Sequence, residues 1–388
     1  MAELNSTPSG ERIHIGIFGR RNAGKSALIN ALTSQKLAIV SDVAGTTTDP
    51  VSKAMELLPL GPVVITDTPG LDDVGELGTM RVEKTMQALA KTDIAVIVAD
   101  ASRGMSEHET ALIADVKSRG VPYVLVYNKC DIAKPTAEDG ICVSAATGEG
   151  IDALKEKLAA FAAKEPERQL ISDLVERGDT VILVVPIDAS APKGRLILPQ
   201  QQVIRDLLEA GAIPMVCRDC EVELALSKVS PKMVVTDSQV FGTVSKIVPP
   251  EIPLTSFSML MARYKGNFAE AVSGAATLDT IKTGDKILIS EGCTHHRQCE
   301  DIGTVKLPMW IRKHTGVEPE FAFTSGTEFP TDVSEYKLVI HCGGCTLNPR
   351  EIQRRYRVAK ESGVPMTNYG VAIAHMHGIL SRASKPLL

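Results

Sequence analysis

The glycine-rich run GRRNAGKS, residues 19–26, constrains the fold more than any other stretch of this 388-residue chain. A strand-like segment, RIHIGIF (12–18), leads into it, and a helix-like segment, ALINALTS, follows it. This order of strand, loop and helix is typical of a phosphate-binding loop in an α/β domain. The backbone N–H groups of such a loop face the phosphates, and the helix N-terminus adds a favourable dipole. We therefore expect Lys25 to reach the β- and γ-phosphates and Ser26 to bind Mg²⁺.

Two further loops extend the predicted phosphate site. The short apolar strand 63–66 ends in Asp67-Thr68-Pro69-Gly70. The Asp67 carboxylate would hold Mg²⁺ through water, and the Gly70 N–H would sense the γ-phosphate. Upstream, the segment Gly45-Thr46-Thr47-Thr48-Asp49 lies in a loop that is able to close over the same phosphate.

A base-recognition motif, Asn128-Lys129-Cys130-Asp131, follows the buried strand predicted at 123–127. The Asp131 carboxylate can accept two hydrogen bonds, from the N1–H and N2–H groups of guanine. Adenine lacks this pair of donors, so the motif predicts GTP rather than ATP. Ser144-Ala145-Ala146 follows the next short strand and would complete the base pocket.

With all five motifs in order, residues 12–163 resemble the translation-factor-class GTPases of the TrmE–Era type. The resemblance implies that Thr47 is the switch threonine on Mg²⁺ and that Asn22 binds a stimulating potassium ion. Leu71 stands where Ras-type GTPases carry a glutamine. No evident general base is present, so catalysis would rest on positioning and charge stabilisation. The expected catalytic residues are Lys25, Thr47, Asp67 and Gly70, and the expected nucleotide contacts are Gly19, Asn22, Ala23, Gly24, Lys25, Ser26, Ala27, Thr47, Asp67, Gly70, Asn128, Lys129, Asp131, Ser144 and Ala145.

The length of the chain predicts more than one domain, and we expect three, at 1–166, 167–265 and 266–388. A net charge of −5 disfavours a dominant nucleic-acid surface, and no apolar run is long enough to span a bilayer. The start of the chain does not have the order of a signal peptide, so we expect a cytoplasmic protein. In that compartment, eight cysteines are more typical of thiols or metal ligands than of disulfides.

The middle segment reads as a parallel α/β unit without an obvious site. Strands are predicted at 180–187, 213–216 and 233–236, with helices between them. Cys217 and Cys220 are either a redox pair, half of a metal site or two incidental thiols, and the third interpretation is favoured because no second pair lies close by.

Two cysteine motifs follow predicted strands of the last segment. Cys293-Thr294-His295 comes after strand 286–290, and His341-Cys342-Gly343-Gly344-Cys345 comes after strand 337–340. Ligands of open parallel sheets bind at these carboxyl ends, so the three thiolates can converge if the strands are neighbours. Spacing alone does not distinguish a structural zinc site from a 4Fe–4S cluster.

With the GTPase motifs and the middle α/β segment, these cysteine motifs make the whole chain resemble the HydF family of FeFe-hydrogenase maturation GTPases. The resemblance implies a 4Fe–4S cluster on Cys293, Cys342 and Cys345 with an exchangeable fourth site. Motif matching favours His295 as fourth ligand over the nearby alternatives His296, Cys299, Glu300 and His341. The resemblance also implies that the protein is a scaffold or carrier for the diiron precursor of the hydrogenase active site. The implied partners are the apo-hydrogenase, the radical-SAM maturation enzymes and further copies of the chain, as a dimer or tetramer.

Two hypotheses of other classes remain open at this point: an Era-like, RNA- or ribosome-associated GTPase with a structural zinc domain, and a redox-sensing GTPase. Two residue groups near the C-terminus receive no metal role. His375 and His377 do not share a helical face, so a core or surface role is favoured for them. Arg350, Arg354 and Arg357 are expected on a solvated face, with the steering of an acidic partner or an anionic ligand as the alternative.

Overall fold

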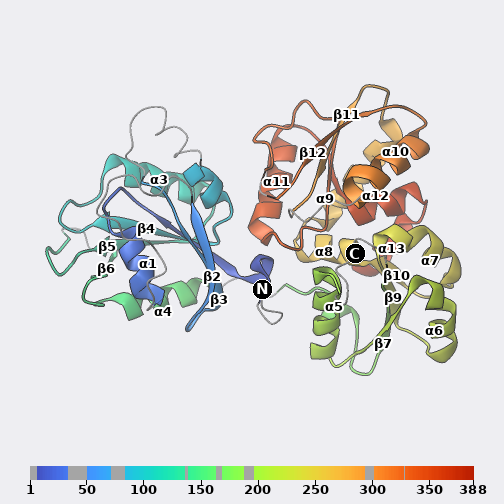
Figure 1. The fold of residues 1–388 in the computed structure, drawn as a ribbon, viewed down its shortest axis with the longest axis horizontal. Coiled ribbons are helices and arrows are strands. Elements are labelled where there is room, and N and C mark those ends of the chain that lie inside the picture. The colour runs from blue at the N-terminus through green and yellow to red at the C-terminus, as the bar shows by residue number, and fades with distance from the viewer. Residues whose placement is uncertain are drawn as a thin grey trace. The chain divides into compact units, whose positions relative to one another are not determined.

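The computed structural model describes residues 7–33, 50–70, 84–135, 139–162, 168–187, 196–292, 301–326 and 328–388. The chain divides into two compact units, Met1–Glu167 and Arg168–Leu388, which Figure 1 draws in blue to green and in green to red. Among the described residues, no helix has both the length and the apolar character needed to cross a membrane.

The first unit is built on a six-stranded sheet with the order β2-β3-β1-β4-β5-β6. Only the β2–β3 pair is antiparallel. Apolar clusters lie on both faces of the sheet, one including residues of α1 and α4 and the other including residues of α3. The elements are η1 (Ser9–Glu11), β1 (Ile13–Phe18), α1 (Lys25–Thr33), β2 (Val51–Leu57), β3 (Gly61–Asp67), β4 (Ile94–Asp100), α3 (Glu107–Ser118), β5 (Tyr123–Asn128), β6 (Ile141–Cys142) and α4 (Ile151–Ala162).

The second unit contains two four-stranded, all-parallel sheets, with the orders β10-β9-β7-β8 and β12-β11-β13-β14. The strands are β7 (Thr180–Val184), β8 (Ile213–Cys217), β9 (Met233–Thr236), β10 (Leu254–Ser256), β11 (Lys286–Ser290), β12 (Glu320–Thr324), β13 (Leu338–His341) and β14 (Met366–Asn368). The helices are η2 (Ser172–Leu174), α5 (Leu198–Glu209), η3 (Asp219–Glu221), α6 (Val222–Lys228), η4 (Ser238–Val240), α7 (Phe241–Ile247), α8 (Phe257–Tyr264), α9 (Phe268–Ala275), η5 (Ala276–Thr280), η6 (Ile302–Lys306), α10 (Leu307–Thr315), α11 (Pro349–Glu361), α12 (Tyr369–Met376), α13 (Leu380–Ser384) and η7 (Lys385–Leu387).

One apolar core runs through the second unit from Leu170 to Leu387 and includes residues of both sheets. A smaller core lies on the other face of the β11 sheet, because alternate residues of its strands point to opposite faces. Ile287 and Ile289 join the large core, whereas Leu288 joins the small one. The predicted division at 265/266 stays a prediction, since these residues form one compact unit.

The α/β class, the N-terminal P-loop domain and the mostly parallel sheets behind it are confirmed. Some strands differ from the sequence predictions, and two of the differences have a clear physical reason. The strand predicted at 180–187 ends at Val184, because Pro186 has no N–H to donate and Ile187 is exposed. The sequence did not predict β2, because this edge strand is largely exposed and lacks an apolar run.

Candidate nucleotide site and cysteine site

Two glycines give the loop after β1 a shape that other residues would not allow. Gly19 has φ +147°, and a Cβ there would lie 2.2 Å from the Val98 carbonyl oxygen. Gly24 has φ +90°, and a Cβ there would lie 2.2 Å from Asn128 Nδ2. The loop therefore depends on glycine at both ends.

The predicted phosphate and magnesium residues begin α1. Lys25 Nζ donates to the carbonyl oxygens of Gly19 (3.0 Å) and Arg20 (2.8 Å), so the ammonium group lies inside the loop. Ser26 Oγ donates to Asp67 Oδ2 at 2.6 Å, which joins the loop to the end of β3.

Asp67 has the features of a metal-binding carboxylate. Burial raises its pKa, against the lowering effects of the Ser26 hydrogen bond and the Lys25 charge. Its Oδ1 is buried and has no hydrogen-bond partner among the described residues. A divalent cation would satisfy this oxygen, and a hydroxyl beside a carboxylate is a donor set that Mg²⁺ accepts. The residues present thus fit the predicted ion. Thr47 and Leu71 lie outside the described residues, and Gly70 is the last described residue before the gap at 71–83.

The base motif holds the phosphate loop from the other side. Asn128 Nδ2 donates to the Ala23 carbonyl oxygen (3.0 Å), while its Oδ1 accepts from the Ala145 N–H (3.1 Å). Asn128 therefore positions two loops. Ser144 is buried and its Oγ accepts from the Thr147 N–H at 3.1 Å.

Lys129 links the base motif to the phosphate loop and to Asp100, a residue that the sequence analysis did not predict. Its Nζ donates to the Asn22 carbonyl oxygen (2.8 Å) and to Asp100 Oδ2 (2.7 Å) at the end of β4. Burial would raise the pKa of Asp100, but hydrogen bonds from Lys129 and Ser102 outweigh it and hold the pKa below its usual value. Asp131 follows, exposed to solvent, as a base-reading carboxylate must be before nucleotide binds.

A second missed anchor joins the loop to α3. Arg20 donates from its backbone N–H and from Nε to Oε1 of the buried Glu109, at 3.3 and 2.9 Å. Glu109 also completes the capping box of α3 with Ser106. The only sequence signal was the spacing Ser106-x-x-Glu109, which is typical of a helix start.

In the second unit, β11 and β13 are adjacent and parallel, with Ser290 opposite His341. The condition for convergence of the two cysteine motifs is therefore met. The Gly292 N–H, just after β11, donates to Cys342 Sγ at 3.0 Å, just after β13. Cys293, His295, His296, Cys299 and Glu300 lie outside the described residues.

Hydrogen-bond donors and a cation lie beside the two described cysteines of this site. Cys342 Sγ accepts a second, longer hydrogen bond from the Gly344 N–H (3.4 Å). Burial raises the pKa of Cys345, and the nearby Lys265 ammonium opposes that rise. Lys265 is itself buried and donates to the Leu347 carbonyl oxygen at 2.7 Å. N–H groups directed at sulfur and a buried cation both stabilise thiolate ligation, so these residues fit an iron–sulfur cluster.

His341 is not available as the fourth ligand. Its Nδ1 lies 2.7 Å from the Cys342 carbonyl oxygen, which can only accept, so Nδ1 carries the proton. Its Nε2 then accepts from Arg355 Nη1 at 2.9 Å. Burial, and then the Arg355 charge, lower the pKa of His341 to about 3. Both ring nitrogens are therefore engaged, and the neutral ring positions the Cys342 loop.

Arg355 is a further residue that sequence reasoning missed. It is fully buried beneath the cysteine loop and donates to Glu351 Oε1 (2.8 Å), Ser290 Oγ (3.2 Å) and the Gly326 carbonyl oxygen (2.6 Å). The expected arginine face of this helix is only partly solvated, because Arg354 pairs with the same Glu351 while Arg357 is exposed. The signal available was the Glu351–Arg355 spacing of four residues on α11.

The favoured interpretation of Cys217 and Cys220 as incidental thiols fits their surroundings. Burial, followed by nearby acidic groups, raises the pKa of Cys217 to about 11, which disfavours a reactive thiolate. Cys220 is exposed in η3. Among the described residues, neither belongs to a group of three or more side chains able to hold a metal.

The first unit has the features of a P-loop GTPase. They are a P-loop after β1, a carboxylate at the end of β3 and a guanine motif after β5. The family model described as 50S ribosome-binding GTPase matches residues 14–129. Most of the remaining chain matches two models of one family, the hydrogen maturase F dimerization domain at 170–266 and tetramerization domain at 269–386. Together they cover more than half of the sequence, and the chain belongs to the hydrogen maturase F (HydF) family.

Other similarities are to individual GTPases. The tRNA modification GTPase MnmE of Laribacter hongkongensis is 38% identical over 159 residues, which are 38% of this chain and 34% of that protein. The MnmE of Thiobacillus denitrificans is 36% identical over 160 residues, 39% of this chain and 34% of that protein. The chain thus spans about a third of the length of these curated relatives. The crystal structure of Aquifex aeolicus Era bound to GDP·AlF4⁻ is 19% identical with a TM-score of 0.36, covering 60% of this chain and 97% of that one.

Proposed function

We propose that this chain is a GTPase that also carries a 4Fe–4S cluster and, through it, the diiron precursor of the FeFe-hydrogenase active site. The observation that carries the proposal is the Gly292 N–H on Cys342 Sγ, which brings the loops after β11 and β13 together. This contact lies in a chain whose second unit matches the hydrogen maturase F models.

In the nucleotide site, Ser26, Asp67 and Thr47 hold Mg²⁺, and Lys25 neutralises charge on the β- and γ-phosphates. Asp131 selects guanine, with Asn128 and Ala145 positioning the base loop. Water attacks the γ-phosphate in line, and the Gly70 N–H reads its presence. Asn22 would hold a potassium ion, which would supply positive charge beside the phosphates.

In the cysteine site, Cys293, Cys342 and Cys345 would hold the cluster, with His295 the expected fourth ligand. When bound, the cluster supplies an iron whose fourth ligand can exchange for a group of the incoming precursor, which is cargo. Lys265 and the Gly292 and Gly344 N–H groups balance the negative charge on the sulfurs. The recipient is the apo-hydrogenase, and radical-SAM maturation enzymes supply the precursor. The nucleotide state of the GTPase site controls release of the precursor.

Cluster content tests this proposal. Protein purified without oxygen and reduced with dithionite is expected to give a 4Fe–4S EPR signal and about four irons per chain. Cys342→Ser should lose most of the iron and the signal yet keep GTP hydrolysis, because the nucleotide site uses other residues. Cys217→Ser removes a thiol without a metal role and should retain both the iron and the EPR signal.

Stoichiometric zinc with no EPR signal in the wild type would contradict the proposal and favour the RNA-associated GTPase with a zinc domain. Lost GTPase activity in a folded Cys342→Ser protein would instead favour the redox-sensing GTPase.

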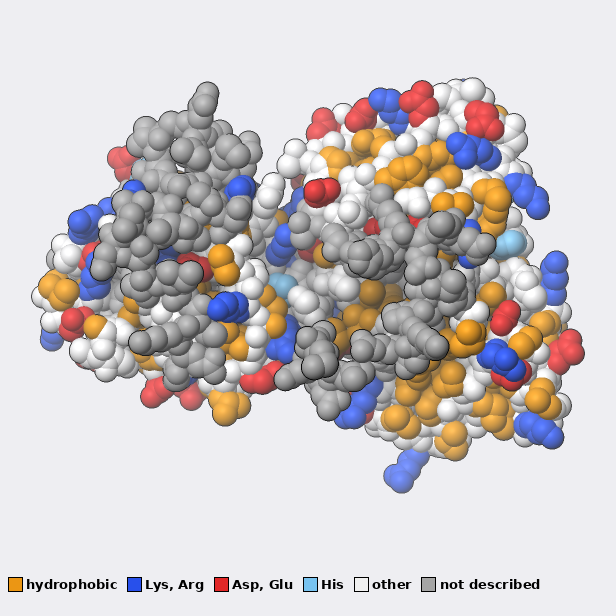
Figure 2. All heavy atoms as spheres, viewed as in Figure 1, with side chains coloured by type: hydrophobic (Ala, Val, Ile, Leu, Met, Phe, Trp, Pro, Cys, Tyr) orange, Lys and Arg blue, Asp and Glu red, His pale blue; other side chains and the backbone are white. Residues whose placement is uncertain are grey.

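We further propose that the edge strand β8 forms the contact with a second copy. Ile213 and Val216 of this strand are 55% and 46% exposed, although β8 closes one side of its sheet. Figure 2 shows hydrophobic side chains gathered over the part of the second unit that holds α5, β7 and α6. An exposed apolar edge strand favours pairing with another chain, and this segment matches the dimerization model.

A charge on this edge should weaken the dimer. We expect Val216→Lys to lower the mass from multi-angle light scattering about twofold, because two copies would bury a lysine against each other. Leu58→Lys, at an exposed position of the first unit, is the matched control and should leave the mass unchanged. An unaltered mass for Val216→Lys would exclude β8 from the contact.

A further inference from the structure

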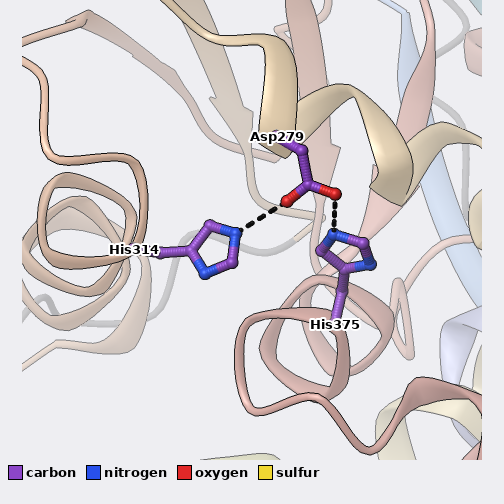
Figure 3. A group of neighbouring side chains, drawn as sticks. All are labelled: Asp279, His314 and His375. Carbon is purple, nitrogen blue, oxygen red and sulfur yellow. Dashed lines mark hydrogen bonds and ion pairs between the residues drawn. The ribbon is translucent and has the colours of Figure 1, made fainter.

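Three side chains from separate elements of the second unit meet outside both sites described above. Asp279 lies in η5, His314 in the last turn of α10 and His375 in the last turn of α12. Figure 3 shows both imidazole rings turned toward the two oxygens of one carboxylate. His314 Nε2 lies 2.9 Å from Asp279 Oδ1, and His375 Nε2 lies 3.0 Å from Asp279 Oδ2.

The arrangement has the geometry of a metal site before the ion enters. One ligand atom from each residue lies within 4.8 Å of the other two. In a tetrahedral site with bonds of about 2.0–2.1 Å, ligand atoms are about 3.4 Å apart. The two nitrogen–oxygen distances, each to a different oxygen of Asp279, are shorter than this value, so the side chains must move apart slightly to admit an ion.

Charge and exposure also favour a cation here. The Asp279 carboxylate places negative charge between the two imidazole rings. Both histidines lie at helix C-termini, where the helix dipole is negative and favours positive charge. Their side chains are 25% and 19% exposed and that of Asp279 is 55% exposed, which leaves a coordination position open to solvent.

We propose that Asp279, His314 and His375 form a divalent transition-metal site for which Zn²⁺ is the best-fitting ion. Two imidazoles and one carboxylate are ligands that zinc accepts, with water in the fourth position. Binding moves the proton of each histidine from Nε2 to Nδ1, so that Nε2 presents its lone pair to the metal. The ion then ties η5, α10 and α12 together.

The single tryptophan of the chain, Trp310, offers a direct test. It lies four residues before His314 on α10, so the two side chains emerge from the same face of the helix. Paramagnetic Co²⁺ in the site should quench Trp310 fluorescence, whereas diamagnetic Zn²⁺ should not. Titration of the full chain should give quenching that saturates at one equivalent of Co²⁺ and reverses when Zn²⁺ is added.

Two variants separate a metal site from a hydrogen-bonded cluster. His375→Gln keeps a donor for Asp279 but removes the imidazole, and it lies on a different helix from Trp310. It should weaken Co²⁺ binding by at least about 10–100-fold, since loss even of an outer-shell partner has that effect. His377→Ala, on the same chain segment but outside the cluster, should bind Co²⁺ as the wild type does.

The proposal is overturned if Co²⁺ fails to quench Trp310, or if His375→Gln binds Co²⁺ as tightly as the wild type. Cobalt on the cysteines is recognised by its thiolate charge-transfer band, so failure of this site leaves the iron–sulfur proposal untouched. The EPR signal and GTP hydrolysis should be the same in His375→Gln as in the wild type.

Discussion

Lys25→Ala is expected to slow GTP hydrolysis by about 10²–10³-fold, the loss that follows removal of one donor that stabilises transition-state charge. The Lys25 ammonium lies within the loop, held by the Gly19 and Arg20 carbonyl oxygens. It is therefore already placed where charge develops on the phosphates. The Arg20 guanidinium of the same loop is paired with the buried Glu109, so we do not expect it to compensate for the loss.

Phosphate release at saturating GTP measures this effect, with ATP as the substrate that the Asp131 carboxylate should reject. Lys53→Ala, an exposed lysine of β2, controls for loss of positive charge from the same unit and should hydrolyse GTP normally. Far-UV circular dichroism must show that the Lys25→Ala protein is folded. A folded variant within about tenfold of wild-type activity would exclude Lys25 from the charge-stabilising role assigned to it.

Arg355→Met is expected to destabilise the second unit by about 3–5 kcal/mol, the usual cost of removing one partner of a buried ion pair. Glu351 would lose its buried partner, and His341 Nε2 would lose its donor. The Gly326 carbonyl oxygen and Ser290 Oγ lose hydrogen bonds as well. Methionine keeps much of the volume, so the change isolates the charge and its hydrogen bonds.

Guanidinium unfolding followed by Trp310 fluorescence measures this loss, because the only tryptophan lies in the second unit. Arg354→Met is the matched control: it pairs with the same Glu351 carboxylate, but its side chain is 20% exposed whereas that of Arg355 is fully buried, so we expect a smaller loss of stability. If Arg355→Met and Arg354→Met lowered the free energy of unfolding equally, the burial of Arg355 would not be the cause of its effect.

The stability that Arg355 contributes should depend on pH in a defined direction. Burial raises the pKa of Glu351, but Arg354 and Arg355 outweigh it and hold that pKa below its usual value. A lowered folded-state pKa contributes stability that is present at neutral pH and is lost as pH falls through it. The difference in free energy of unfolding between the wild type and Arg355→Met should therefore become smaller as the pH is lowered.

The sequence determined the local parts of both sites. The P-loop, the Asp67 loop and the base motif are contiguous runs, and each follows a short apolar strand that the sequence also marks. Strand β13 and the turn after it likewise follow from a few neighbouring residues. Such motifs are readable because the backbone shape and the chemistry are encoded within a dozen residues.

Tertiary structure decided what depends on residues far apart in the chain. Only the pairing of β11 with β13 brings Gly292 to Cys342, and only folding buries Arg355 against His341. His375 was assigned no metal role because its neighbour His377 points elsewhere on the helix, yet its partners are Asp279 and His314. Helix periodicity shows which face a side chain occupies, but packing between elements decides what that face meets.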